Sequence, residues 1–148
     1  METRCLWRFP QVLATPPVLD DGTLFPTLYW LSCPWLVEGV SARESDGDVA
    51  AWASRLADTP ELASRMRTAD EHYRDRRANI ARGLVDPCGG VGIAGQRDPL
   101  ATKCLHAHTA AALAGIEDPV GCELLLELGT ACSDERCAAF IQAAKEEP

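Results

Sequence analysis

Two apolar runs on either side of an Asp-Gly turn constrain the fold of this chain most. The runs, residues 11–19 and 23–31, flank Asp20-Asp21-Gly22, and Asp-Gly between apolar runs is a strong local signal of a β-hairpin. Both runs contain prolines, which cannot donate a ladder hydrogen bond, so we expect short or irregular strands. Because an isolated hairpin is marginal in water, the rest of the chain must cover one of its faces.

Beyond the hairpin, apolar residues recur at three- and four-residue spacing, which predicts helices. Proline in the first turn or glycine after the last turn marks most of the helix ends. The predicted helices cover about 34–44, 48–56, 60–83, 99–115, 119–129 and 133–145. Asp48 is the expected cap of the second helix, which runs through Leu56, and Ser133 is the expected cap of the last. We therefore predict a helix-dominated α+β single domain over residues 1–148, with the hairpin at about 11–31 and the helical part at about 34–145.

Charge and hydropathy limit the partners and the compartment. The chain has 14 basic and 22 acidic residues, a net charge of −8, which argues against a nucleic-acid or anionic-membrane surface. No run approaches the ~20 apolar residues of a membrane span, and prolines interrupt the N-terminal apolar stretches before a signal-peptide core can form. We expect a cytoplasmic protein that binds neither nucleic acid nor membrane, with a small-molecule or protein partner that the sequence does not identify.

The seven cysteines are an odd number in a chain without an export signal, which favours free thiols or metal ligands over a disulfide framework. Cys122 matches a core position on its helix, and no partner for Cys88 can be identified. The densest reactive segment is 103–108, Lys-Cys-Leu-His-Ala-His. On a continuous helix Cys104 would share a face with His108 and not with His106. If the helix begins only after this segment, Cys104 and His106 can face one centre; a buried thiol beside satisfied histidines is the plainer alternative.

Four further cysteines are candidate ligands. Cys33 precedes a helix that starts with proline, where the helix dipole favours a thiolate. Cys132 and Cys137 flank the predicted cap Ser133. At this spacing the two thiolates can bind one metal centre together, or the two side chains can pack as a hydrophobic staple. Cys5 lies just before the first strand. The predicted metal ligands are therefore Cys33, Cys104, His106, Cys132, Cys137 and Cys5.

The long helix at 60–83 carries six arginines against four acidic residues. We expect Arg76, Arg77 or Lys103 to hold an anionic group of a substrate, although a solvated helix face with internal ion pairs would give the same pattern. The glycine-rich residues 88–95 lack the Lys-Ser/Thr ending of a phosphate-binding loop and follow no evident strand, so they match neither a P-loop nor a dinucleotide fingerprint.

Several segments that together span most of the chain carry a family resemblance: Arg4-Cys5, the Phe-Pro-Thr-Leu-Tyr-Trp-Leu-Ser-Cys-Pro stretch at 25–34, the glycine-containing loop, Lys-Cys-Leu-His at 103–106 and Asp-Pro-Val-Gly at 118–121. Through these segments the chain resembles a bacterial family known as domain of unknown function family 501. The resemblance implies a bacterial cytoplasmic protein whose signature includes thiols and a histidine, and it implies no reaction. The glycine loop, Gly-Val-Gly-Ile-Ala-Gly, departs from the shorter Gly-Gly form of the family.

These observations lead to one functional hypothesis and two alternatives. The first is a cysteine-ligated metal centre, an iron–sulfur cluster with zinc as the alternative metal, acting in redox or sulfur-related small-molecule chemistry. Iron–sulfur is preferred because clusters gather thiolates from distant segments, whereas structural zinc uses close cysteine pairs. The alternatives are a metal-free nucleophilic enzyme using Cys33 or Cys104 with His106, and a zinc-stabilised or metal-free module that binds another protein.

Overall fold

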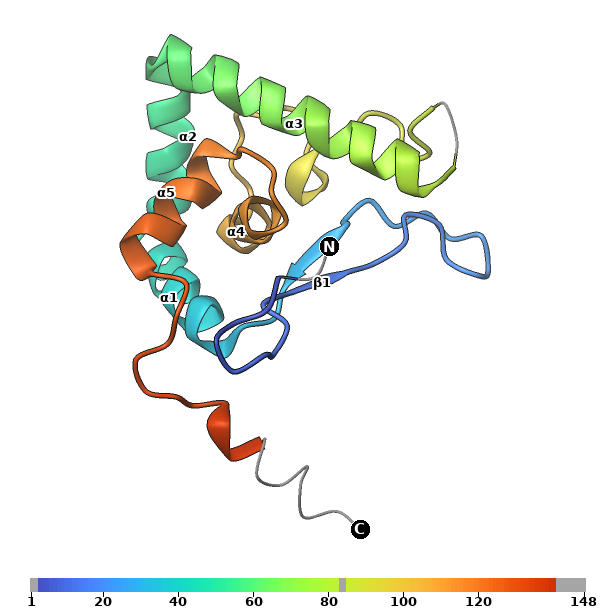
Figure 1. Ribbon diagram of the computed structural model, residues 1–148. Coiled ribbons are helices and arrows are strands. Elements are labelled where there is room, and N and C mark those ends of the chain that lie inside the picture. The colour runs from blue at the N-terminus through green and yellow to red at the C-terminus, as the bar shows by residue number, and fades with distance from the viewer. Residues whose placement is uncertain (1–2, 83–84, 141–148) are drawn as a thin grey trace.

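The computed structural model describes residues 3–82 and 85–140. Figure 1 shows helices arranged around α4, with the hairpin lying to one side. The elements in order are β1 (Val12–Ala14), β2 (Tyr29–Leu31), α1 (Pro34–Ser45), α2 (Asp48–Asp58), α3 (Pro60–Ile80), the 3-10 turn η1 (Ile93–Gly95), α4 (Leu105–Leu113) and α5 (Pro119–Leu128). The predicted helix-dominated α+β fold with an N-terminal hairpin is confirmed.

The hairpin has short strands, as its prolines predict. β1 and β2 pair antiparallel with Val12 opposite Leu31, and an isolated bridge joins Val18 to Leu24 nearer the Asp-Gly turn. Between these two regions the prolines interrupt the ladder. The buried side chain of Val12 turns toward the core, so the hairpin uses the helices as the cover that it needs.

Helix α4 forms the centre of the core. It packs against α5, β2 and α1, and its residues Leu105 and Ala111 are fully buried. The backbones of α5 and α4 touch at Gly121. A Cβ built on this glycine would lie 2.1 Å from the carbonyl oxygen of His108. The Asp118 carboxylate caps α5 by accepting hydrogen bonds from N–H groups of the first turn, which is the usual role of an aspartate at this position.

Helix α3 crosses the top of the molecule in Figure 1 and connects the hairpin to the core. Met66 and Tyr73 are buried on its inner face. The Tyr73 hydroxyl accepts the backbone N–H of Leu28 at 2.7 Å, inside the protein. Because a buried N–H without an acceptor costs free energy, this single contact fixes the start of β2 against the helix.

Two helices begin at residues other than those predicted. Gly47, with φ of 92°, occupies the N-cap position of α2, and Asp48 is the first helical residue; the tight link from α1 requires a left-handed backbone, which glycine adopts most easily. The helix expected from residue 99 starts only at Leu105. Thr102 has φ of 47°, and a left-handed residue cannot lie within a right-handed helix.

The C-terminal helix predicted from Ser133 also differs. Residues 133–137 form bends and turns, and helical backbone starts at residue 138. Residues 141–148, which include the rest of that prediction, lie outside the described part. After α5 the chain therefore runs as an irregular segment, visible below the helices in Figure 1.

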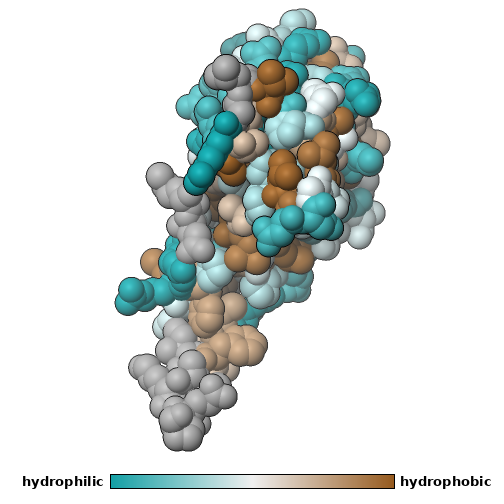
Figure 2. All heavy atoms as spheres, turned by 90° about the vertical axis from the view of Figure 1, so that its right-hand side faces the viewer, coloured by the Kyte–Doolittle hydropathy of each residue, from teal (hydrophilic) through white to brown (hydrophobic). Residues whose placement is uncertain are grey.

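The face that carries the hairpin exposes many apolar side chains among polar ones (Figure 2). Within residues 3–82 and 85–140 no helix is both long and apolar enough to cross a membrane. The large apolar side chains exposed on the hairpin are Leu13, Val18, Leu19, Leu24 and Trp30.

Candidate metal centre

Four of the seven cysteines line one cavity at the N-terminal end of α1, which we call the four-cysteine pocket. Cys33 is the N-cap residue of α1; Cys5 comes from the N-terminal loop, and Cys132 and Cys137 come from the segment after α5. The cavity has a volume of about 220 Å³. The fold thus brings together four of the six predicted ligands from three segments that are distant in sequence.

Hydrogen bonds connect these three segments around the pocket. The Ser32 hydroxyl donates to the Pro10 carbonyl at 2.8 Å, and the Ser32 N–H donates to the Gln11 carbonyl at 2.9 Å. The side-chain amide of Gln11, which is buried, donates to the Thr130 carbonyl at 2.7 Å. The positions of the cysteines therefore depend on long-range contacts that no local sequence pattern encodes.

The walls of the pocket are mostly apolar, with one arginine. The rings of Phe9 and Phe140 meet edge to face with centroids 6.5 Å apart. The Arg136 guanidinium lies 5.4 Å from the centre of the Trp35 ring and pairs with Asp134 at 2.6 Å. Apolar walls exclude water, and an adjacent guanidinium favours negative charge on sulfur.

The electrostatics of the thiols reflect their closeness. Cys33 is buried at the N-terminus of α1. Burial raises the pKa of the Cys137 thiol, and the nearby thiols of Cys33, Cys132 and Cys5 raise it further. A bound cation would reverse this repulsion, because thiolate ligands lose their protons when they coordinate.

The sulfur atoms of the four-cysteine pocket are spread more widely than the ligands of one small ion. A tetrahedral zinc ion with sulfur at about 2.3 Å places its thiolates within about 4 Å of each other. Among the residues that the structure describes, only one set of three His, Cys, Asp or Glu side chains has its ligand atoms all within 4.8 Å of one another. None of the four pocket cysteines belongs to this set. The pocket, in this conformation, suits a ligand larger than one ion.

That other group is Glu44, Cys104 and His106. The Nδ1 atom of His106 lies 3.2 Å from Oε1 of Glu44. Glu44 follows Cys33 by eleven positions along α1, which corresponds to about 16 Å along a helix axis. The structure therefore places Cys104 and His106 apart from the four-cysteine pocket and gives them a partner, Glu44, that we did not identify from the sequence.

The local backbone explains this grouping. Cys104 is the extended N-cap residue of α4, with φ of −151° and ψ of 112°. The structure matches neither geometry considered for segment 103–108: the helix is not continuous through the segment and does not wait until its end, but begins at Leu105. Cys104 lies just before the helix, and its sulfur is within 4.8 Å of a ring nitrogen of His106. His108 does not join them: its Nδ1 contacts Asp118 at 2.6 Å, and both side chains are fully buried.

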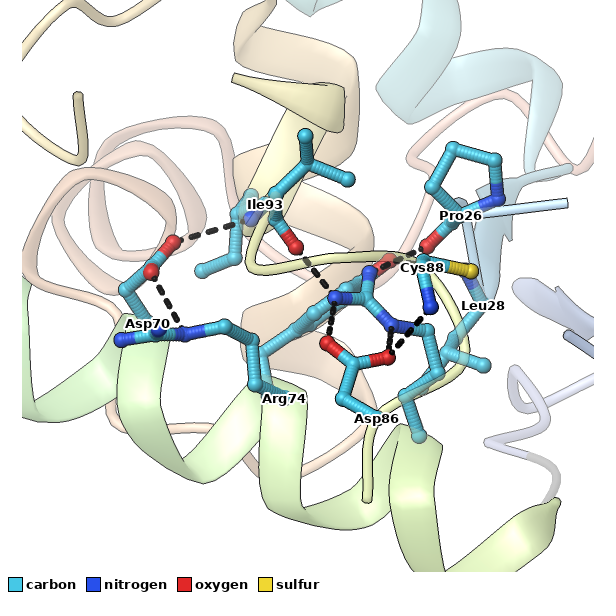
Figure 3. A network of polar contacts seen from close by, with 10 residues as sticks. Pro26, Leu28, Asp70, Arg74, Asp86, Cys88 and Ile93 are labelled. Atoms are coloured by element: carbon cyan, nitrogen blue, oxygen red, sulfur yellow. Dashed lines mark hydrogen bonds and ion pairs between the residues drawn. The ribbon is translucent and has the colours of Figure 1, made fainter. Parts of the chain in front are cut away.

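Arg77, predicted to bind substrate, is instead part of the buried framework. Its side chain is fully buried, with Nε 2.7 Å from Asp86 Oδ1 and Nη1 2.8 Å from the Pro26 carbonyl; Nη2 donates to Asp86 and to the Val91 carbonyl. Figure 3 shows this network and the neighbouring contacts of Asp70. Four of the five guanidinium N–H groups have acceptors within the protein, and the side chain is fully buried, so Arg77 does not face a ligand in solvent.

The other two predicted substrate residues differ in their surroundings. Arg76 donates through Nη1 to the Ala114 carbonyl at 2.5 Å and through Nη2 to the Gly115 carbonyl at 3.1 Å. It therefore binds the unpaired carbonyl groups at the end of α4, as basic residues commonly do. Lys103 is exposed next to Cys104, so it is the predicted substrate residue that solvent reaches most freely.

The glycine-rich loop covers the buried charges of α3. A Cβ on Gly92 would lie 1.6 Å from Oδ1 of Asp70, so only glycine allows this approach. The same oxygen accepts the Ile93 N–H at 3.0 Å, and burial raises the pKa of Asp70. The loop contacts a carboxylate of the protein itself, in keeping with the poor match to phosphate-binding motifs.

The remaining thiols lie outside both groups. Cys122 on α5 and Cys88 in the glycine-rich segment are half-buried, and burial raises the pKa of each. The Cys88 backbone N–H donates to Asp86 at 3.0 Å. These two cysteines provide natural controls for experiments on the others.

Fold and site together define a helix-dominated α+β protein with a thiol-lined pocket and a separate Cys–His–Glu group. Residues 1–126 match the family described as Protein of unknown function (DUF501), and the chain belongs to this family. Comparison with curated proteins and with solved structures gives no match. Cys5, Cys33 and the Glu44–Cys104–His106 group lie within the matched residues, whereas Cys132 and Cys137 follow them.

Proposed function

We propose that this protein holds an iron–sulfur cluster in the four-cysteine pocket and uses it in redox or sulfur-related chemistry of small molecules. The observation that carries the proposal is that four thiols from three distant segments line one cavity. Four cysteine thiolates are the usual ligands of [2Fe–2S] and [4Fe–4S] clusters. Cys104 and His106 are not needed for this centre.

The donor set favours soft metals. Thiolates select zinc, copper(I) and iron–sulfur clusters, whereas magnesium and calcium require oxygen ligands. Of these, the cluster accounts best for the spacing, because no three of the four sulfur atoms lie within 4.8 Å of one another. A cluster of several iron and sulfide ions spans a larger distance between its thiolates than a single ion does.

The surroundings of the pocket support a cluster of negative charge. Four thiolates contribute four negative charges, which the iron ions and the positive end of α1 at Cys33 offset in part. The aromatic walls, among them Phe9 and Trp35, limit access of water. Charge, hydrogen bonds to sulfur and exposure to solvent set the potential of such a cluster.

The test is elemental analysis with a visible spectrum on protein purified without oxygen. We expect iron and acid-labile sulfide in equal amounts and visible absorbance that is bleached on reduction. Cys132→Ser is expected to lose most of the iron, while Cys122→Ser, a half-buried thiol outside the pocket, keeps it. Because Cys132 is a partly exposed residue in an irregular segment, this substitution leaves the core intact, and the far-ultraviolet spectrum checks that it does.

Two results would overturn the proposal. One is protein without iron after anaerobic reconstitution with iron and sulfide. The other is Cys132→Ser protein with the iron content of the wild type. A colourless protein with stoichiometric zinc lost in Cys132→Ser would instead favour the zinc-stabilised interaction module.

A further inference from the structure

Glu44, Cys104 and His106 form a compact group of three different donors with no part in the proposed cluster. Their ligand atoms all lie within 4.8 Å of one another. Glu44 comes from the last turn of α1, and the other two come from the start of α4. Each is partly exposed, so an ion can reach them from solvent.

The oxygen donor of Glu44 and the nitrogen donor of His106 are already at the spacing of two ligands of one metal ion. The His106 Nδ1 to Glu44 Oε1 distance is 3.2 Å, and ligands at about 2.0–2.2 Å from a tetrahedral zinc ion lie about 3.3–3.6 Å apart. The Cys104 sulfur lies within 4.8 Å of both, so it needs to approach by at most about 1 Å. Rotation of one side chain on an extended residue supplies such a movement.

Neighbouring groups orient these ligands as partners in metal sites do. The Leu105 N–H donates to Oε1 of Glu44 at 2.7 Å, which ties the carboxylate to the start of α4. The Nε2 atom of His106 lies 3.2 Å from the Ser41 hydroxyl. A histidine that binds metal through one nitrogen usually engages its other nitrogen with a hydrogen-bond partner, and Ser41 is in that position.

The same contacts argue against a metal-free Cys–His nucleophile at this place. His106 contacts Glu44 through Nδ1 and Ser41 through Nε2. To take the proton of Cys104 as a general base, His106 would have to give up one of these two contacts. A cation, in contrast, uses the donors of Glu44, Cys104 and His106 at once.

We infer that Glu44, Cys104 and His106 bind a single zinc ion with an open coordination position. A thiolate, an imidazole and a carboxylate are all established zinc ligands, and three protein ligands with one vacant position are typical of catalytic zinc. The thiolate and the carboxylate together neutralise the charge of the ion. The site shares no residue with the four-cysteine pocket, so it goes beyond the proposed cluster.

A cavity beside this group indicates what the open position takes. Cys104 and His106 line a cavity of about 350 Å³, whose other lining residues include Tyr29, Leu31 and Val37. The β2 strand and α1 thus provide mainly apolar walls next to the ligands. The site takes a small molecule with an apolar body and one metal-binding group, or water in its place.

The experiment titrates cobalt(II), a spectroscopic substitute for zinc, into Cys33→Ser/Cys132→Ser protein without oxygen. This variant lacks two thiols of the four-cysteine pocket. We expect one equivalent of cobalt to bind with thiolate-to-cobalt charge-transfer absorbance, and zinc to displace it. Absence of binding, or binding without that absorbance, would overturn the inference.

Variants identify the ligands. Cys104→Ser should abolish the charge-transfer band, and Glu44→Gln should weaken cobalt binding at least about 100-fold. Gln at position 44 can still accept the Leu105 N–H, so the helix contact stays in place and thermal unfolding of the metal-free protein should match the wild type. Ser41→Ala should weaken binding by about 10-fold, the usual effect of losing a partner of a metal-bound histidine. Unchanged affinity in Glu44→Gln, or an unchanged band in Cys104→Ser, would refute the ligand assignment.

The open position has its own measurement. Benzohydroxamate joins an apolar ring to a metal-binding group, and we expect it to shift the cobalt bands of the same variant. Bands that do not respond would show that the coordination sphere is closed. Wild-type protein that contains iron but no zinc would refute the zinc site and support the proposed cluster. Zinc bound at Glu44–Cys104–His106 in protein without iron would support the zinc site and refute the cluster.

Discussion

Asp86→Asn tests whether Arg77 is a structural residue. Asp86 accepts Nε of Arg77 at 2.7 Å and Nη2 at 2.5 Å, while the Arg77 side chain is fully buried. The substitution removes the charge and places an amide donor against a guanidinium donor. Arg77 then stays buried without a counter-charge.

The magnitude follows from burial. Breaking a buried ion pair by removing one partner costs about 3–5 kcal/mol. Asp86 retains 16% exposure of its side chain, and the carbonyl groups of Pro26 and Val91 still accept from Arg77. We therefore expect the low end of this range, about 3 kcal/mol.

Urea unfolding measures the effect. With a slope of about 2 kcal/mol per molar urea for a small protein, the midpoint should fall by about 1.5 M. Glu127→Gln is the matched control, because its ion pair with Arg43 is exposed on both sides and should contribute less than about 1 kcal/mol. Equal stability losses in the two variants would refute the reasoning.

The pH dependence gives a second readout. The ion pair with Arg77 lowers the pKa of Asp86 from 3.8. Its stabilisation is therefore complete above pH 3.8 and is lost as the pH falls through the lower value of the folded protein. The difference between wild type and Asp86→Asn should narrow below pH 3.8, and a constant difference would contradict this linkage.

Three further predictions use the core. Tyr73→Phe leaves the buried Leu28 N–H without its acceptor and should lower the free energy of unfolding by about 1–3 kcal/mol. A loss below about 0.5 kcal/mol, the usual size of a surface substitution, would contradict it. Burial raises the pKa of Tyr73 from 10.0 to about 12, so wild-type stability should fall relative to Tyr73→Phe above pH 10, measured by urea unfolding. Gly121→Ala places a Cβ 2.1 Å from the His108 carbonyl oxygen and should cost about 3 kcal/mol or more, whereas Gly39→Ala, which meets only a flexible side chain, should be nearly neutral in thermal unfolding.

The sequence determines the local elements of this protein well. Proline at the first turn identified the starts of α1, α3 and α5, and the Asp-Gly turn with its flanking prolines identified a hairpin with short strands. These signals are local, because the backbone freedom of proline and glycine depends on one or two residues. The predicted start of α4 was wrong because Thr102 adopts a left-handed backbone, which a threonine in the sequence does not indicate.

The sequence also named the chemically active residues without grouping them correctly. Cys5, Cys33, Cys132 and Cys137 were all candidates, but so were Cys104 and His106. Only the packing of the N-terminal loop and the C-terminal segment around the start of α1 separates the two sets. Glu44 was missed because a glutamate near a helix end is common, and no local feature links it to a residue sixty positions later.

Tertiary structure likewise decided the role of Arg77. From the sequence it is one of six arginines on a long helix, available to an anion. In the fold, the glycine-rich loop and the hairpin close over it and supply carbonyl and carboxylate acceptors. Residue type and spacing fix what a side chain can do, but burial and partners, which depend on contacts between distant segments, fix what it does.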